Sequence, residues 1–108
     1  MDFQVRKASQ EDMPSVLSLI QQLAVYEREP DAVEVTVEDL ERDGFGENPL
    51  FNCFVAETEG KIIGMALFYF RYSTWKGKTV HLEDLIVNEA YRGHGIGFQI
   101  YKKVMEFA

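Results

Sequence analysis

Apolar residues recur every three or four positions from residue 13 to residue 24, a spacing that predicts an amphipathic helix. Upstream, Ser9 and Asp12 form a capping box, and the segment Phe3–Lys7 reads as a short strand. Pro14 indicates either a loosened first turn or a helix that Asp12 caps directly. The predicted buried face consists of Met13, Val16, Leu17, Ile20, Leu23 and Ala24.

Two further helices are predicted. Thr36 and Asp39 form a second capping box, which opens a short helix that ends near Gly44. At the end of the chain, apolar residues return at helical spacing up to the last residue. The apolar positions of this last helix are Ile100, Tyr101, Val104 and Met105.

Three strand-like segments lie between these helices: Phe51–Glu57, Ile62–Tyr72 and Thr79–Val87. The turn Thr58–Lys61 joins the first two into a hairpin, and the loop Ser73–Lys78 leads to the third. The predicted order is β-α-α-β-β-β-α. This order indicates an α+β fold with an antiparallel meander in its middle.

The length of 108 residues predicts one domain, residues 1–108, and an apolar fraction of 46% is enough for a core. No run approaches the roughly 20 apolar residues of a membrane span, and no signal-peptide pattern opens the chain, so we expect a soluble cytoplasmic protein. Cys53 is the only cysteine and there are two histidines, so no disulfide framework and no metal site are expected. Its apolar surroundings predict a buried structural thiol.

A net charge of −7 argues against a nucleic-acid partner, because phosphate backbones attract basic surfaces. Acidic residues concentrate between Glu27 and Glu47, with only Arg28 and Arg42 among them. This run is either a solvated helix face and loop or a negative rim that attracts a cationic substrate. Composition leaves both interpretations open.

The segment Tyr91–Gly97 carries three glycines at alternate positions, between a predicted strand and a predicted helix. Such a turn has little side-chain bulk, so backbone N–H groups can converge on an anion at the start of the helix, next to Arg92. A dinucleotide fingerprint and a P-loop have other spacings. A glycine-rich turn without a ligand is the remaining alternative.

The order strand, Arg-Gly-x-Gly-x-Gly, helix resembles the pyrophosphate loop of the GNAT acetyltransferases, which bind acetyl-CoA. The segments Leu23–Glu27, Asp43–Gly46, Tyr69–Lys78 and His81–Val87 resemble the spermidine/spermine branch of that superfamily, which includes diamine and thialysine acetyltransferases. The likeness covers essentially the whole chain. It implies a GNAT-like mixed sheet whose C-terminal part is missing, because a complete domain continues beyond the equivalent of Ala108.

The resemblance also implies a site for a small cationic amine. It makes Glu83 the catalytic base, acting through water, and a substrate ligand together with Asp84. Consecutive strand residues face opposite sides unless a bulge intervenes, and the resemblance places a bulge in this strand. The alternative is that one or both acids pair with Lys76 and Lys78. The remaining implied substrate-binding residues are Tyr26, Glu27 and Trp75, the last of which is equally compatible with a core position.

For the cosubstrate, the resemblance implies backbone contacts to the pantetheine arm of acetyl-CoA from Leu85, Ile86 and Val87. An N–H near Leu85 would also polarise the thioester carbonyl. The pyrophosphate would bind at the following loop, in which His94 is expected to point to solvent. The loop residues implied are Arg92, Gly93, His94, Gly95, Ile96, Gly97 and Phe98.

Two positions depart from the branch. Ser73 stands where an acid is usual, which favours a shorter amine such as a diamine or thialysine. The general-acid tyrosine of the family falls beyond Ala108, so the 108-residue chain is expected to be inactive alone. The resemblance implies a homodimer. The alternative function is a non-catalytic module that binds CoA or a protein.

Overall fold

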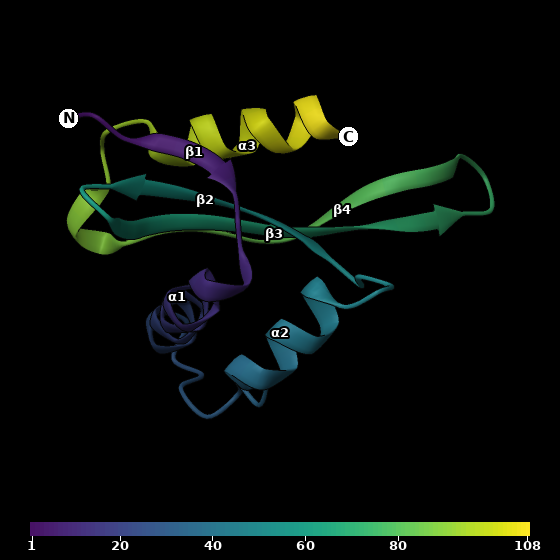
Figure 1. Ribbon diagram of the computed structural model, residues 1–108, viewed down its shortest axis with the longest axis horizontal. Coiled ribbons are helices and arrows are strands. Elements are labelled where there is room, and N and C mark those ends of the chain that lie inside the picture. The colour runs from purple at the N-terminus through teal and green to yellow at the C-terminus, as the bar shows by residue number, and fades with distance from the viewer.

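The computed structural model describes residues 1–108, which form one four-stranded sheet between two layers of helices (Figure 1). Helices α1 and α2 cover one face of the sheet, and α3 lies across the other. In chain order the elements are β1 (Gln4–Lys7), η1 (Gln10–Asp12), α1 (Met13–Tyr26), α2 (Val37–Phe45), β2 (Asn52–Thr58), β3 (Lys61–Ser73), β4 (Gly77–Val87), η2 (Glu89–Tyr91) and α3 (Ile96–Phe107). The expected α+β order is confirmed.

The sheet has the order β1-β2-β3-β4, and each neighbouring pair is antiparallel. β4 therefore lies at one edge. The long hairpin of β3 and β4 extends well past the helical layers, as Figure 1 shows at its right-hand end. No helix of the structure is both long and apolar enough to cross a membrane.

Two separate cores hold the layers together, one on each face of the sheet. On the face covered by α1 and α2, here called the α1 face, β3 contributes Met65 and Leu67 and β4 contributes Ile86. On the opposite α3 face, Ala66 and Phe68 of β3 pack on the last helix. The alternation along β3 thus assigns odd-numbered residues to the α1 face and even-numbered residues to the α3 face over this stretch.

The predicted helix caps are confirmed, with one refinement. Thr36 and Asp39 make the reciprocal capping box of α2, with Thr36 N–H to Asp39 Oδ2 at 3.0 Å and Asp39 N–H to Thr36 Oγ1 at 3.1 Å. The Ser9–Asp12 box opens the 3₁₀ turn η1 instead of α1 itself, and Asp12 occupies the N-cap position of α1 without a side-chain capping hydrogen bond. Pro14 therefore sits in the first turn, where no backbone N–H is required.

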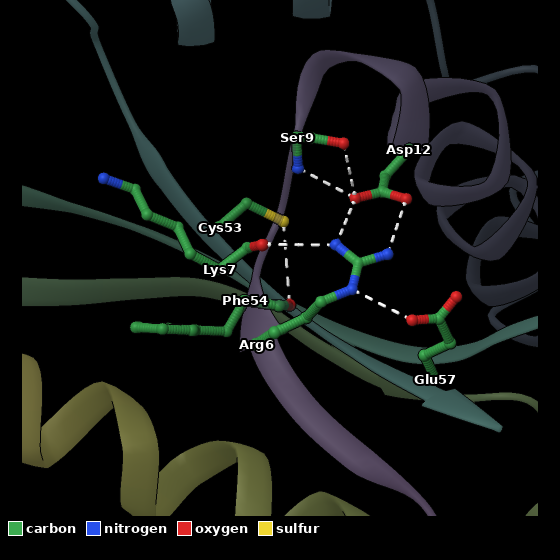
Figure 2. Close-up of polar contacts among 7 residues, drawn as sticks. All are labelled: Arg6, Lys7, Ser9, Asp12, Cys53, Phe54 and Glu57. Atoms are coloured by element: carbon green, nitrogen blue, oxygen red, sulfur yellow. Dashed lines mark hydrogen bonds and ion pairs between the residues drawn. The ribbon is translucent and has the colours of Figure 1, made fainter. Parts of the chain in front are cut away.

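Arg6 links three elements at the start of the chain (Figure 2). Its guanidinium donates to both carboxylate oxygens of Asp12, at 2.7 and 3.1 Å, and to Glu57 Oε1 of β2 at 3.0 Å. Asp12 also accepts from the Ser9 N–H at 2.8 Å. These bonds tie β1 to β2 and to the start of α1, and they lower the pKa of the Asp12 carboxyl.

Cys53 lies in the same region, beneath the β1–α1 connection, and only 4% of it is exposed. Burial raises the pKa of the thiol to about 12. A thiol that stays protonated is a poor nucleophile. The predicted structural role of Cys53 is therefore confirmed.

The inner side of α3 is packed on the sheet, where Ile100 and Val104 are fully buried. Phe107 packs edge-on against Phe54 and Phe68 and keeps 44% of its surface exposed. The four-stranded sheet is wide enough to cover the side of α3 that carries Ile100 and Val104. The apolar residues of α3 that remain exposed lie on its outer side: Phe98, Tyr101 and Met105.

Candidate functional site

A β-bulge at Glu83 is the central feature of the site. In the β3–β4 ladder, Asp84 pairs with Leu67 and Leu82 pairs with Phe68, which leaves Glu83 as an extra residue without a partner. Asp84 therefore faces the α1 side, as Leu67 does, while Leu82 faces α3. The bulge expected from the resemblance is confirmed, and its position is at the first of the two acids.

The bulge gathers both carboxylates on the α1 face. Glu83 Oε1 lies 3.5 Å from Nε2 of His81, whose cross-strand partner Tyr69 belongs to the odd-numbered, α1-facing set of β3. Neither acid pairs with Lys76 or Lys78, so that interpretation is not supported. Lys78 instead lies over the ring of Phe70, with Nζ 4.4 Å from the ring centroid.

Glu27, at the C-terminal cap of α1, supplies a third carboxylate. The pKa of Asp84 is raised, first by its partial burial and then by the negative charges of Glu83 and Glu27. We call Glu27, Glu83 and Asp84 the carboxylate cluster. A cluster of this kind binds cations, because a nearby positive charge relieves the repulsion among the three acids.

A groove of about 800 Å³ lies beside this cluster, between α1 and the end of β4. Tyr26 and Arg92 face each other across it, with the guanidinium carbon 5.4 Å from the ring centroid. Ile86 and Val87 also line the groove, as the resemblance implied for cosubstrate contacts. The sequence did not indicate the polar lining residues contributed mainly by α1: Ser18, Gln21, Gln22 and Asn88.

The glycine loop, residues 92–98, begins at the groove, which its first residue, Arg92, lines. Gly93 and Gly95 have φ values of +89° and +73°, which only glycine adopts readily. The six backbone N–H groups from Gly93 to Phe98 donate to no acceptor within the protein, so they are free to bind an anion. Ile96 buries its side chain, so only its backbone is available, and His94 is exposed as expected.

Two residues assigned from the sequence lie elsewhere. Leu85 points to the α3 face and is 38% exposed, so it offers the groove only its backbone. Trp75 is 93% exposed at the tip of the β3–β4 hairpin, so the core alternative is wrong. Glu83 lies six positions along β4 from Gly77, or roughly 20 Å at strand spacing. This chain therefore does not bring Trp75 to its own carboxylate cluster.

No group of histidine, cysteine and acidic side chains in the structure is arranged to hold a metal ion.

Known proteins are similar to this chain in sequence and in fold. Residues 13–108 match the acetyltransferase (GNAT) family. The thialysine N-epsilon-acetyltransferase of Bos taurus is 46% identical over 96% of the chain, and that of Caenorhabditis elegans is 33% identical over 99%. The human spermidine/spermine N(1)-acetyltransferase-like protein 1 is 46% identical over 98% of the chain. The chain spans 66% of the length of both thialysine enzymes and 16% of that human protein.

Solved structures agree on the fold. An aminoglycoside acetyltransferase from a soil metagenomic sample, crystallised with sisomicin, superposes with a TM-score of 0.76 at 22% identity, covering 97% of this chain and 68% of that one. A ribosomal-protein-alanine N-acetyltransferase from Brucella melitensis gives 0.74 at 15% identity, covering 98% and 70%. The fold, the glycine loop and the family match lead to one conclusion: this chain belongs to the GNAT family of acetyltransferases.

Proposed function

We propose that the protein is an acetyl-CoA-dependent N-acetyltransferase whose substrate is a small primary amine with further positive charge. A polyamine, a diamine or a thialysine-like amino acid fits this description. The observation that carries the proposal is that one groove is lined by Tyr26, which precedes Glu27, by Ile86, two residues after Asp84, and by Arg92 of the glycine loop. An acceptor for cations and a donor set for phosphate therefore meet at one place.

The residues present fit the cosubstrate. The free N–H groups of residues 93–98 and the guanidinium of Arg92 would hold the pyrophosphate. Backbone groups of Leu85, Ile86 and Val87 would bind the pantetheine amides, and the amide side chains of Gln21 and Gln22 line the same groove. Acetyl-CoA supplies the activated acyl group as a thioester.

The carboxylates would carry the substrate chemistry. An alkylamine has a pKa near 10.4 in water, so it arrives as an ammonium ion and must lose a proton before it can attack. Glu83, which is half exposed, accepts that proton through a water molecule. The nitrogen then forms its bond to the thioester carbon while the carbon–sulfur bond breaks, so that the acetyl group moves directly from the cosubstrate to the amine. CoA leaves as a thiolate and takes up the proton that the new amide nitrogen releases.

Asp84, Glu27 and Tyr26 would bind the part of the amine that does not react. Asp84 is the most strongly desolvated acid of the cluster, and a distal ammonium next to it would lower its raised pKa again. Similarity to thialysine N-epsilon-acetyltransferases and to a spermidine/spermine N(1)-acetyltransferase-like protein supports this substrate class. We also propose a cytoplasmic protein that works as a homodimer, with no nucleic acid or membrane as a partner.

Acetylation assays with acetyl-CoA and putrescine, spermidine or thialysine test this function, on a version of the protein that carries a complete GNAT domain, because the 108 residues alone are expected to be inactive. At least one amine should be acetylated, and Glu83→Gln should lower kcat by about 10²-fold or more, as expected for loss of a general base. Glu59→Gln, a matched change in the exposed β2–β3 turn, should leave kcat unchanged. An unaltered kcat in Glu83→Gln, or the absence of turnover with every amine, would contradict the assignment.

A further inference from the structure

Nothing in the packing holds the carboxylate of Glu83. The residue has no cross-strand partner in the ladder, its side chain is 54% exposed, and it accepts no hydrogen bond from the backbone or from a hydroxyl group. Asp84, by contrast, pairs in register with Leu67 and is partly buried. A bulge residue that carries the proposed base needs another group to orient it.

His81 is the one ion-pairing partner that Glu83 has. Its Nε2 lies 3.5 Å from Glu83 Oε1. The imidazole itself is fixed by Tyr69 on β3, with which it pairs across the strands at a ring-centroid distance of 5.0 Å and a tilt of 40°. The charged and titratable groups nearest to His81 on this face are Tyr69 and Arg71 of β3 and Glu83 of β4, followed by Asp84 and by Glu27 at the end of α1.

We propose that His81 is a positioning residue that controls whether Glu83 is available to the amine. This inference rests on the proposed function, because it assigns a regulator to the base of that reaction. A protonated imidazole pairs with Glu83 and competes with the ammonium group of the substrate for the same carboxylate. A neutral imidazole leaves Glu83 free to bind the amine and to accept its proton.

The consequence is a pH-dependent affinity for the amine. Histidine side chains change charge between about pH 5 and pH 8, whereas alkylamines remain cationic throughout that range. The amine should therefore bind more weakly at pH 6 than at pH 8.5. A protonated imidazole competes for Glu83 at the lower pH, while the charge of the amine stays constant. Binding of the cosubstrate, which does not involve Glu83, should not follow this pattern.

Two variants, made in the complete-domain version used for the acetylation assays, hold residue 81 in an uncharged or a charged state. His81→Gln is polar and never charged, and His81→Lys is charged at every pH in the range. At pH 8.5 the KM of the wild type for the amine should equal that of His81→Gln. At pH 6 it should approach that of His81→Lys and exceed that of His81→Gln by about threefold, the size expected for a partly exposed ion pair. Using ratios to His81→Gln removes the effect of pH on the fraction of neutral amine.

Calorimetry of spermidine binding at both pH values gives the same ratios without turnover. A ratio that does not change with pH, or a His81→Lys variant that binds amine as well as His81→Gln does, would overturn the role of His81. Turnover of no amine, with spermidine binding that still follows the predicted ratios, would overturn the proposed function alone. Failure to bind any of spermidine, putrescine and thialysine at either pH would overturn both, and an amine that binds where spermidine does not replaces it in the measurement.

Discussion

Arg6 donates two parallel hydrogen bonds to Asp12, of 2.7 and 3.1 Å, from the two terminal nitrogens of its guanidinium to the two carboxylate oxygens. Only 11% of the Asp12 side chain is exposed, so the pair is largely removed from water. The contact fixes the sharp turn by which the chain leaves the sheet and enters α1. Because α1 carries Tyr26 and Glu27 at its far end, this turn also sets the direction in which those residues approach the sheet.

Replacing Asp12 with Asn should destabilise the protein. The change removes the charge from a largely buried pair and leaves Arg6 with weaker acceptors, at a cost of about 2 kcal/mol in the free energy of unfolding. Chemical denaturation at pH 7 measures this loss. Glu11→Gln, a matched change in the same turn at an exposed position, should shift the free energy by less than about 0.5 kcal/mol.

The same pair predicts an acid dependence of stability. Hydrogen bonds from Arg6 lower the pKa of Asp12 below its unfolded value of 3.8, so the stabilisation is complete above that pH and disappears as the pH falls through the folded pKa. The stability difference between wild type and Asp12→Asn should therefore be constant from pH 7 to about pH 5 and shrink toward pH 2. A difference that stays constant down to pH 2 would show that charge is not the source of the effect.

Asp84→Asn should have the opposite effect on stability. The pKa of Asp84 is raised in the folded chain, so its ionised form is less favourable there than in the unfolded chain. Removing the charge should stabilise the protein at pH 7 by about 0.5 kcal/mol, after allowance for solvent screening, and the gain should vanish below about pH 4. Asp31→Asn, in the exposed loop before α2, is the control. A lower melting temperature in Asp84→Asn would count against a repulsive carboxylate cluster.

Glycine-to-alanine substitutions can separate the effect of backbone strain on stability from the effect of the glycine loop on ligand binding. Gly95→Ala places a side chain at φ +73° and should cost about 1–2 kcal/mol. Gly60→Ala carries a similar strain, at φ +77°, but lies in the β2–β3 turn, outside residues 92–98. Gly97→Ala has an ordinary helical position, and its Cβ would meet only Val87 at 3.6 Å.

Thermal unfolding and calorimetry with CoA measure these three variants. Gly60→Ala should lower the melting temperature without changing CoA affinity, and Gly95→Ala should lower both. Gly97→Ala should keep the melting temperature and weaken CoA binding, because its new methyl group occupies the approach to the free N–H groups. Unchanged CoA affinity in both loop variants would remove the loop from the cosubstrate site.

The purified 108-residue chain should self-associate. β4 offers an unpaired edge, and the outer side of α3 exposes Phe98, Tyr101 and Met105. Light scattering should give a mass above the 12.4 kDa of one chain. Leu85→Lys on the strand and Tyr101→Asp on the helix distinguish the two surfaces, since only the change in the true interface should restore the monomer. A folded wild-type monomer of 12.4 kDa would contradict the prediction.

Sequence patterns predicted the elements well, because caps and periodicity are local signals. The capping box of Thr36 and the apolar spacing of α1 both fixed helix positions to within a few residues. Leu19 was missed on the buried face of α1, although its spacing from Val16 is helical. The Arg6–Asp12–Glu57 network could not be predicted, because it depends on the register between β1 and β2.

The site was less accessible to pattern analysis. The alternation of strand side chains alone would have placed Glu83 and Asp84 on opposite faces of the sheet, and only the family resemblance predicted a bulge. Trp75 belongs to the family motif, yet the length of the hairpin carries it away from the carboxylates of its own chain. His81 was overlooked, although a histidine two positions before an acid on a strand is a same-face neighbour and could have been noticed.

The bulge has a consequence for the length of β4. Before Glu83 the odd-numbered residues of the strand face α1, and after it the even-numbered residues do. The alternation of faces therefore shifts by one residue at the bulge. Most substitutions in β4 alter one side chain. Deleting a single residue from this strand would instead give it one continuous alternation of faces. Either Val80 and Leu82 would then turn away from the core on the α3 face, or Ile86 would turn away from the core on the α1 face. The length of this strand is therefore under stricter control than its composition.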